Sequence, residues 1–173
     1  MNIIQQNIFF SNTFSFFREI YYNYCSMYYA IVVTCFCIGI AIVDLKSFRI
    51  PDALLASFAL FMVIAEWGQP YELVITRLAA AMLAFFLFAI IWFHSKGIGF
   101  GDVKYAAVLG YLLGFERLVQ AFIYTAVLSM VIYLMGIILF RWTKTTKIPF
   151  APFMSAGAIM AITVNFFAVG GIS

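Results

Sequence analysis

The stretch KGIGFGDVKY, residues 96–105, places three glycines and an aspartate between two long apolar runs. Gly97, Gly99 and Gly101 alternate with apolar residues and lead directly into Asp102. The flanking runs are apolar enough for membrane-spanning helices, so flexible backbone and a carboxylate meet at the predicted edge of a bilayer. Irregular backbone at that depth is tolerated only where it is buried in protein or lines a water-filled cavity. The stretch therefore predicts a break between two helices and a wet cavity beside Asp102.

The composition of the whole chain indicates the class of protein. Hydrophobic residues make up 66% of the 173 positions, only 10% are charged, and the mean hydropathy is +1.06. Soluble domains contain about 45–50% apolar residues, so an ordinary soluble fold is excluded. We predict an all-α, polytopic membrane protein with one membrane-embedded domain over residues 28–173. Residues 1–27, rich in Phe, Tyr and Ile, are expected to form an aromatic segment at the membrane interface.

Six apolar segments are candidates for membrane-spanning helices, each of which needs about 20 residues to cross a bilayer. They are residues 27–43, 53–67, 73–93, 105–115, 118–140 and 149–169. The second and fourth are short, which indicates helices that are tilted, half-buried or ended early beside a cavity.

The positions of Lys and Arg predict the orientation of these helices. The loops after the first, third and fifth segments hold seven of the ten basic residues, namely Lys46, Arg49, Lys96, Lys104, Arg141, Lys144 and Lys147. We therefore expect these loops in the cytoplasm, both termini outside, and the chain in the cytoplasmic (inner) membrane.

Three of the seven acidic residues, Asp44, Asp52 and Asp102, lie at the predicted cytoplasmic edge. Asp44 closes the first segment and Asp102 opens the fourth, so two residues far apart in sequence are predicted at one depth. A carboxylate at the end of an apolar helix is costly unless it is solvated, paired or functional. Structural alternatives exist for each: Asp44 would pair with Lys46 or Arg49, and Asp102 would cap the helix that follows it.

Two aspartates at one depth suit the activation of water. Like charges held about 3 Å apart cannot both ionise, so such a pair shares one proton. The ionised member takes a proton from water, the neutral member hydrogen-bonds the scissile carbonyl, and no acyl-enzyme forms. The neighbouring glycines, which lack side chains, would let an extended substrate backbone approach. The sequence leaves open which aspartate is the base.

Three segments resemble the prepilin peptidases, the membrane aspartyl proteases that process type IV pilin-like precursors. They are Asp44-Leu-Lys-Ser-Phe-Arg-Ile-Pro51, Gly97-Ile-Gly-Phe-Gly-Asp102-Val-Lys104 and Ile148-Pro-Phe-Ala-Pro-Phe153, in the family's order. The resemblance covers about residues 28 to 169 and implies that Asp44 and Asp102 are the catalytic pair. The residues that it implies bind substrate or shape the site are Arg49, Pro51, Gly97, Gly99, Gly101 and Lys104.

The resemblance also implies a substrate and a setting. Similar enzymes cut a short basic leader from a prepilin-like precursor, after a glycine and just before a hydrophobic segment, at the cytoplasmic side of the bilayer. No metal and no organic cofactor is implied. The abundant aromatic residues show no stacking pattern for nucleic acid, so nucleic acid is not expected as a partner.

The chain departs from many members of that family. It has no Cys-x-x-Cys pair, and Asp44 follows the first segment without room for a cytosolic insert. A peptidase-only form is therefore the closer comparison, and the sequence leaves open whether the new N-terminus is methylated. Two other functions remain open. A proton-coupled transporter or an assembly factor would use the aspartates as a proton relay and place acids at mid-membrane depth, and an inactive scaffold would tolerate Asp→Asn at both positions.

Overall fold

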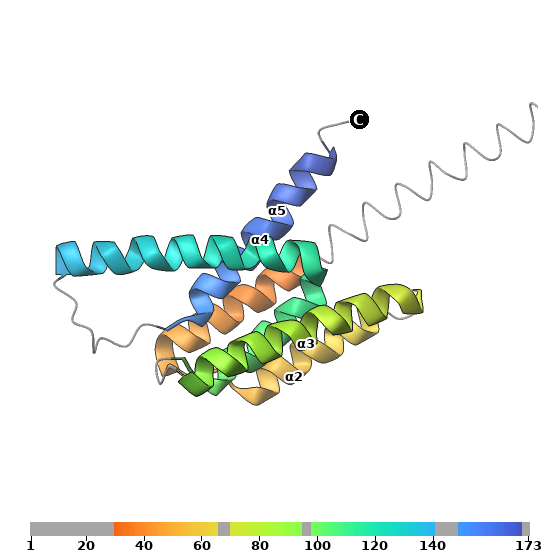
Figure 1. The fold of residues 1–173 in the computed structure, drawn as a ribbon, viewed down its shortest axis with the longest axis horizontal. Coiled ribbons are helices and arrows are strands. Elements are labelled where there is room, and N and C mark those ends of the chain that lie inside the picture. The colour runs from red at the N-terminus through yellow and green to blue at the C-terminus, as the bar shows by residue number, and fades with distance from the viewer. Residues whose placement is uncertain (1–29, 66–69, 95–97, 141–148, 171–173) are drawn as a thin grey trace, which may run out of the picture. The chain divides into compact units, whose positions relative to one another are not determined.

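A computed structural model describes residues 30–65, 70–94, 98–140 and 149–170 (Figure 1). All regular secondary structure in these ranges is helical, which confirms the predicted all-α membrane fold. The helices are Ala30–Ser47, α2 (Asp52–Ala65), α3 (Tyr71–His94), α4 (Phe100–Phe140) and α5 (Ala151–Gly170). The predicted aromatic segment 1–27 lies outside the described residues.

The chain divides into two compact units, residues 1–35 and 36–173. Only residues 30–35 of the first unit are described, and they are helical. Every contact reported below lies within the second unit.

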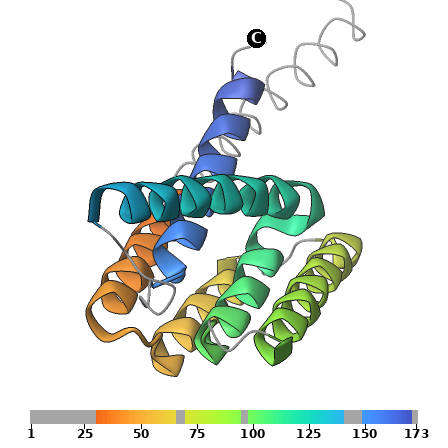
Figure 2. The same ribbon diagram turned by 60° about the vertical axis from the view of Figure 1, so that its left-hand side comes forward.

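The long helix α4 consists of two helices joined at one residue. Gly114 has φ 67° and ψ 178°, a conformation that only glycine adopts readily, so residues 100–113 and 115–140 meet at a sharp bend (Figure 2). The two predicted segments, 105–115 and 118–140, thus follow one another without a loop, and the first begins earlier, at Phe100. With this bend, the described chain contains six helical segments, one for each predicted span.

The lengths of the helices fit a membrane protein. Ala30–Ser47, Tyr71–His94 and Phe100–Leu139 are long and apolar enough to cross a bilayer, and Asp52–Ala65 and Ala151–Val164 are shorter apolar helices. At 1.5 Å per residue, the 14 residues of α2 span about 21 Å, less than the roughly 30 Å of the hydrocarbon core. The second segment is therefore short, as its sequence predicts.

Small residues allow α4 to pack closely against α3 and α5. A Cβ atom at Gly110 would lie 2.8 Å from the carbonyl oxygen of Ala80 on α3. A Cβ atom at Gly157 on α5 would lie 2.5 Å from the carbonyl oxygen of Ala121 on α4. Helices in lipid associate through such small residues because lipid tails remove the hydrophobic drive between helices. The first contact packs the part of α4 before the bend against α3, and the second packs the part after the bend against α5.

Candidate active site

Asp44 is a buried carboxylate at the end of the first described helix. Cys37, Ile40 and Asp44 repeat at helical spacing on one buried face of Ala30–Ser47, and Asp44 is 4% exposed. Its Oδ2 accepts a hydrogen bond of 3.2 Å from the backbone N–H of Ala151, the first residue of α5. The N-terminus of a helix carries partial positive charge and unpaired N–H groups, so it is a suitable partner for a carboxylate.

The chain turns sharply just after Asp44. Phe48 has φ 52°, in the left-handed region, and its N–H donates to the carbonyl oxygen of Asp44 at 2.8 Å. The hydroxyl of Ser47 contacts the carbonyl oxygens of Val43 and Arg49 at 2.8 Å each. These bonds satisfy carbonyl groups at the helix end and direct the chain into α2.

Asp102 lies in the first turn of α4 and is 7% exposed. Its Oδ2 accepts a hydrogen bond of 3.1 Å from the N–H of Gly99, and its own N–H donates to the carbonyl oxygen of Gly99 at 3.1 Å. An acidic side chain that reaches back to the residue preceding its helix is one half of a capping box. Asp102 therefore caps its helix, as the structural alternative predicts, and is a buried carboxylate as well.

Two contacts place the segments that carry these aspartates side by side. A Cβ atom at Gly101 would lie 3.3 Å from the Cβ of Ile50, a buried residue between the first helix and α2. The carboxylates of Asp44 and Asp102 also lie within range of each other's charge. The turn after the first helix thus meets the start of α4 and the start of α5.

The other residues singled out from the sequence have varied surroundings. Lys104 forms an exposed ion pair of 2.6 Å with Asp52 and lies 5.3 Å from the ring of Phe100. The carbonyl oxygen of Pro51 accepts the first backbone bonds of α2. Arg49 is exposed on the turn, and Gly97 lies outside the described residues.

Gly101 has a packing role that the sequence does not indicate. Its missing side chain admits Ile50, so this glycine brings two protein segments together. Gly99 differs, because a Cβ atom there would lie at an ordinary 3.5 Å from Asp102 Oδ2.

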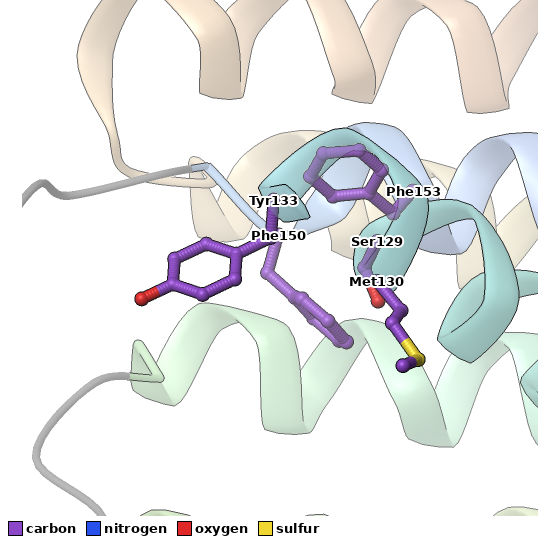
Figure 3. Close-up of a pocket in the computed structure, with 5 residues that line it drawn as sticks. All are labelled: Ser129, Met130, Tyr133, Phe150 and Phe153. Atoms are coloured by element: carbon purple, nitrogen blue, oxygen red, sulfur yellow. The ribbon is translucent and has the colours of Figure 1, made fainter. Parts of the chain in front are cut away.

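An apolar pocket of about 300 Å³ opens next to the start of α5. Ser129, Met130 and Tyr133 from α4 and Phe150 and Phe153 from the start of α5 line it (Figure 3). The two phenylalanines flank Ala151, whose N–H is bonded to Asp44. The tyrosine hydroxyl points away from the other four side chains in Figure 3, so the pocket is suited to an apolar group.

Sequence reasoning missed several groups that surround the carboxylates. The amide of Ala151 falls within the third motif, residues 148–153, but no residue type signals a backbone donor. The buried hydroxyls of Tyr105 and Ser155 are hydrogen-bonded at 2.8 Å near the site, with the buried thiol of Cys37 close to Tyr105, and nothing in their spacing indicates this. Within the described ranges, no group of three or more His, Cys, Asp or Glu side chains is arranged to hold a metal ion.

Comparisons with known proteins agree on one family. Residues 31–135 match the type IV leader peptidase family, and that range includes both buried aspartates. The chain is 30% identical over 133 residues to the prepilin leader peptidase/N-methyltransferase of Bacillus subtilis (strain 168), covering 76% of this chain and 54% of that protein.

Proteins of the same name from two other bacteria also match. One, from Burkholderia pseudomallei (strain 1026b), is 29% identical over 126 residues, which are 69% of this chain and 41% of that protein. Another, from Pectobacterium carotovorum subsp. carotovorum, is 21% identical over 144 residues, which are 80% of this chain and 52% of that protein. The chain thus spans about half the length of the curated relatives it matches. No solved structure matches it.

Proposed function

Because this chain belongs to the type IV leader peptidase family, we propose that it is a membrane aspartyl endopeptidase that removes the leader of type IV prepilin-like precursors. Asp44 and Asp102 are the pair that activates water in this proposal. The observation that carries it is the approach of two buried carboxylates from separate helices, inside the region that the family matches. We assign cleavage to this chain; methyl transfer is named only for those relatives.

The proposed reaction uses one ionised and one protonated carboxyl group. The ionised member takes a proton from water, and the water oxygen attacks the scissile carbonyl carbon while the protonated member hydrogen-bonds the carbonyl oxygen. The tetrahedral intermediate then collapses: the C–N bond breaks, and the leaving nitrogen receives a proton from the pair. The products are a leader with a new carboxylate and a mature chain with a new amino group.

Backbone donors support the geometry that this reaction needs. Each carboxylate is held through its Oδ2, Asp44 by the N–H of Ala151 and Asp102 by the N–H of Gly99. We assign the Oδ1 atom of each to the water and the substrate. A carboxylate that is fixed by a backbone bond cannot rotate freely, and such fixed orientation is a large part of catalysis.

We place the site at the cytoplasmic face of the inner membrane, with both termini outside. The loops that meet at the aspartates are those that the sequence assigns to the cytoplasm from their Lys and Arg content. The apolar pocket between Met130 and Phe150 suits part of the hydrophobic segment that follows the leader. The substrate we propose is therefore an extended peptide that enters from the cytoplasm, with an apolar part held next to α5.

A leader-cleavage assay tests the proposal. The full chain is expressed in membranes with a panel of prepilin-type precursors, and leader removal is followed by gel shift. Asp44→Asn and Asp102→Asn are the informative variants, because asparagine keeps an oxygen that can accept the N–H of Ala151 or Gly99 and removes only the charge. Glu72→Gln, at an exposed carboxylate on α3, is the matched control.

The expected result is cleavage by the wild type and by Glu72→Gln, and by neither aspartate variant at equal folded yield. Cleavage by a folded Asp44→Asn or Asp102→Asn protein would contradict the two-aspartate reaction. A wild type that cleaves none of the panel would contradict the peptidase assignment, and the proton-relay alternative would then be tested by proton flux.

A further inference from the structure

Three buried polar side chains lie together near the two aspartates, and two of them are hydrogen-bonded to each other. Cys37 on the first helix and Tyr105 on α4 are 0% exposed, and Ser155 on α5 is 2% exposed. The Tyr105 hydroxyl lies 2.8 Å from the Ser155 hydroxyl oxygen, and the buried thiol of Cys37 lies near it. The bond thus connects α4 and α5, the helices that supply Asp102 and the Ala151 amide, and Cys37 belongs to the helix that supplies Asp44.

The spacing along each helix relates this cluster to the site. Tyr105 follows Asp102 by three residues, and Ser155 follows Ala151 by four, so each pair shares a face of its helix. The bond between Tyr105 and Ser155 therefore lies about one helical turn further along α4 from Asp102 and about one turn further along α5 from Ala151. Any slide or rotation of α4 against α5 would move both pairs together.

The first helix is related to the cluster in the same way. Cys37 precedes Asp44 by seven residues, about two helical turns, and both are buried on the same face. A thiol is a weak hydrogen-bonding group, so its contact with Tyr105 contributes less than the contact between the two hydroxyls. The first helix is held more firmly at Asp44 itself, through the Ala151 amide.

Burying these polar side chains must be compensated, because a buried hydroxyl group costs free energy unless it is hydrogen-bonded. The close contacts of α4 at Gly110 and Gly157 are between small residues and are not directional. A hydrogen bond is directional, so it can fix the rotation and height of one helix against another where such packing cannot. Two hydrogen bonds supply that direction between α4 and α5: Tyr105 with Ser155 at 2.8 Å before the bend in α4, and Thr125 Oγ1 to the carbonyl oxygen of Phe153 at 3.3 Å after it.

We infer that Tyr105 and Ser155 are positioning residues: their hydrogen bond sets α4 against α5, and so sets Asp102 against the Ala151 amide that holds Asp44. Neither side chain takes part in the bond-making steps. The effect on cleavage rests on the proposed peptidase function, whereas the alignment of the helices is a property of the fold and can be measured without it.

The test uses variants that remove one hydroxyl each. Tyr105→Phe keeps the buried ring, Ser155→Ala removes the other partner, and the double variant removes both. Tyr71→Phe, at an exposed tyrosine in the first turn of α3, is the control for the same chemical change. Two quantities are measured on the purified full chain in detergent: kcat and KM for a precursor that the wild type cleaves, and hydrogen exchange of the peptide covering residues 149–154.

We expect kcat to fall between about 10-fold and 100-fold in each single variant, because a displacement of about 1 Å at a reacting centre can cost about 100-fold. KM is expected to stay unchanged, since neither hydroxyl contacts the substrate. The double variant is expected to be no slower than the slower single variant, because all three lack the same bond. Exchange at residues 149–154 is expected to be faster in all three and unchanged in Tyr71→Phe.

Wild-type exchange at residues 149–154 in both single variants would overturn the inference, and so would a wild-type kcat in both. Losses that multiply in the double variant would overturn it as well, because they would show two independent roles. If Tyr105→Phe does not fold, Ser155→Ala tests the same bond. If the wild type cleaves nothing, the proposed function fails, while the exchange measurement still decides whether this bond aligns α5.

Discussion

Replacing Gly157 by alanine should force α4 and α5 apart and disable the site from a distance. The new Cβ atom would lie 2.5 Å from the carbonyl oxygen of Ala121 and 3.0 Å from the backbone nitrogen of Thr125. The hydroxyl oxygen of Thr125 is also in contact and could turn away, but these two neighbours are backbone atoms, so a change of rotamer does not relieve the overlap. Because non-bonded atoms are most stable at about 3.5 Å or more, α5 must move by on the order of 1 Å.

The displacement would reach the aspartates because Gly157 and Ala151 belong to one helix. Ala151 would shift relative to Asp44, to which it is bonded at 3.2 Å. Overpacking of this kind costs about 1–3 kcal/mol of stability, and a displacement of about 1 Å at the reacting centre costs about 100-fold in rate. We therefore expect Gly157→Ala to melt at a lower temperature and to cleave about 100-fold more slowly at equal folded amount.

Gly39→Ala is the matched control, because a Cβ atom there would meet nothing within 4 Å. In the first helix, alanine is preferred to glycine by about 1 kcal/mol, so this variant should be as stable as the wild type or more stable. Thermal melting in detergent and the leader-cleavage assay are run on both variants. A Gly157→Ala protein with wild-type melting and wild-type cleavage would refute the close contact between α4 and α5.

Three further predictions concern the turns around the site. Gly114→Ala should lower stability by about 1–3 kcal/mol in a thermal melt, because φ 67° with ψ 178° is open to glycine alone, and unchanged melting would argue against the bend in α4. Phe48→Gly should raise the free energy of unfolding by about 1 kcal/mol, because glycine adopts the left-handed conformation of Phe48 without steric cost. A thermal melt that shows no gain would argue against this turn after Asp44. Lys104→Gln should lower the free energy of unfolding by less than about 1 kcal/mol, because its ion pair with Asp52 is exposed. High salt, which screens the same ion pair, should lower the stability of the wild type by a similar amount. A larger loss in the variant would indicate a second role for Lys104.

The helices and their order could be predicted from the sequence because lipid imposes one strong rule. Every backbone polar group must be satisfied within the bilayer, so long apolar segments become helices and their ends follow from polar residues, glycine and proline. The bend at Gly114 was harder to predict. Glycine permits φ above zero but does not require it, and hydropathy is high on both sides of the bend.

The convergence of Asp44 and Asp102 was predictable from depth, since both end apolar segments on one predicted side of the membrane. Their partners were not. The donor to Asp44 is a backbone N–H, which every residue except proline carries, and the bond between Tyr105 and Ser155 joins residues 50 positions apart. Gly101 illustrates the same limit, because its neighbour Ile50 is brought to it only by the tertiary fold.

The most direct test of the two-aspartate reaction is a comparison of cleavage rates for Asp44→Asn, Asp102→Asn and the double variant on one precursor. Residues that act as a unit are grossly non-additive, so each single variant should lose essentially all cleavage and the double variant should be no worse. A folded single variant that still cleaves, or a double variant far slower than both singles, would contradict the claim that these carboxylates work as one pair.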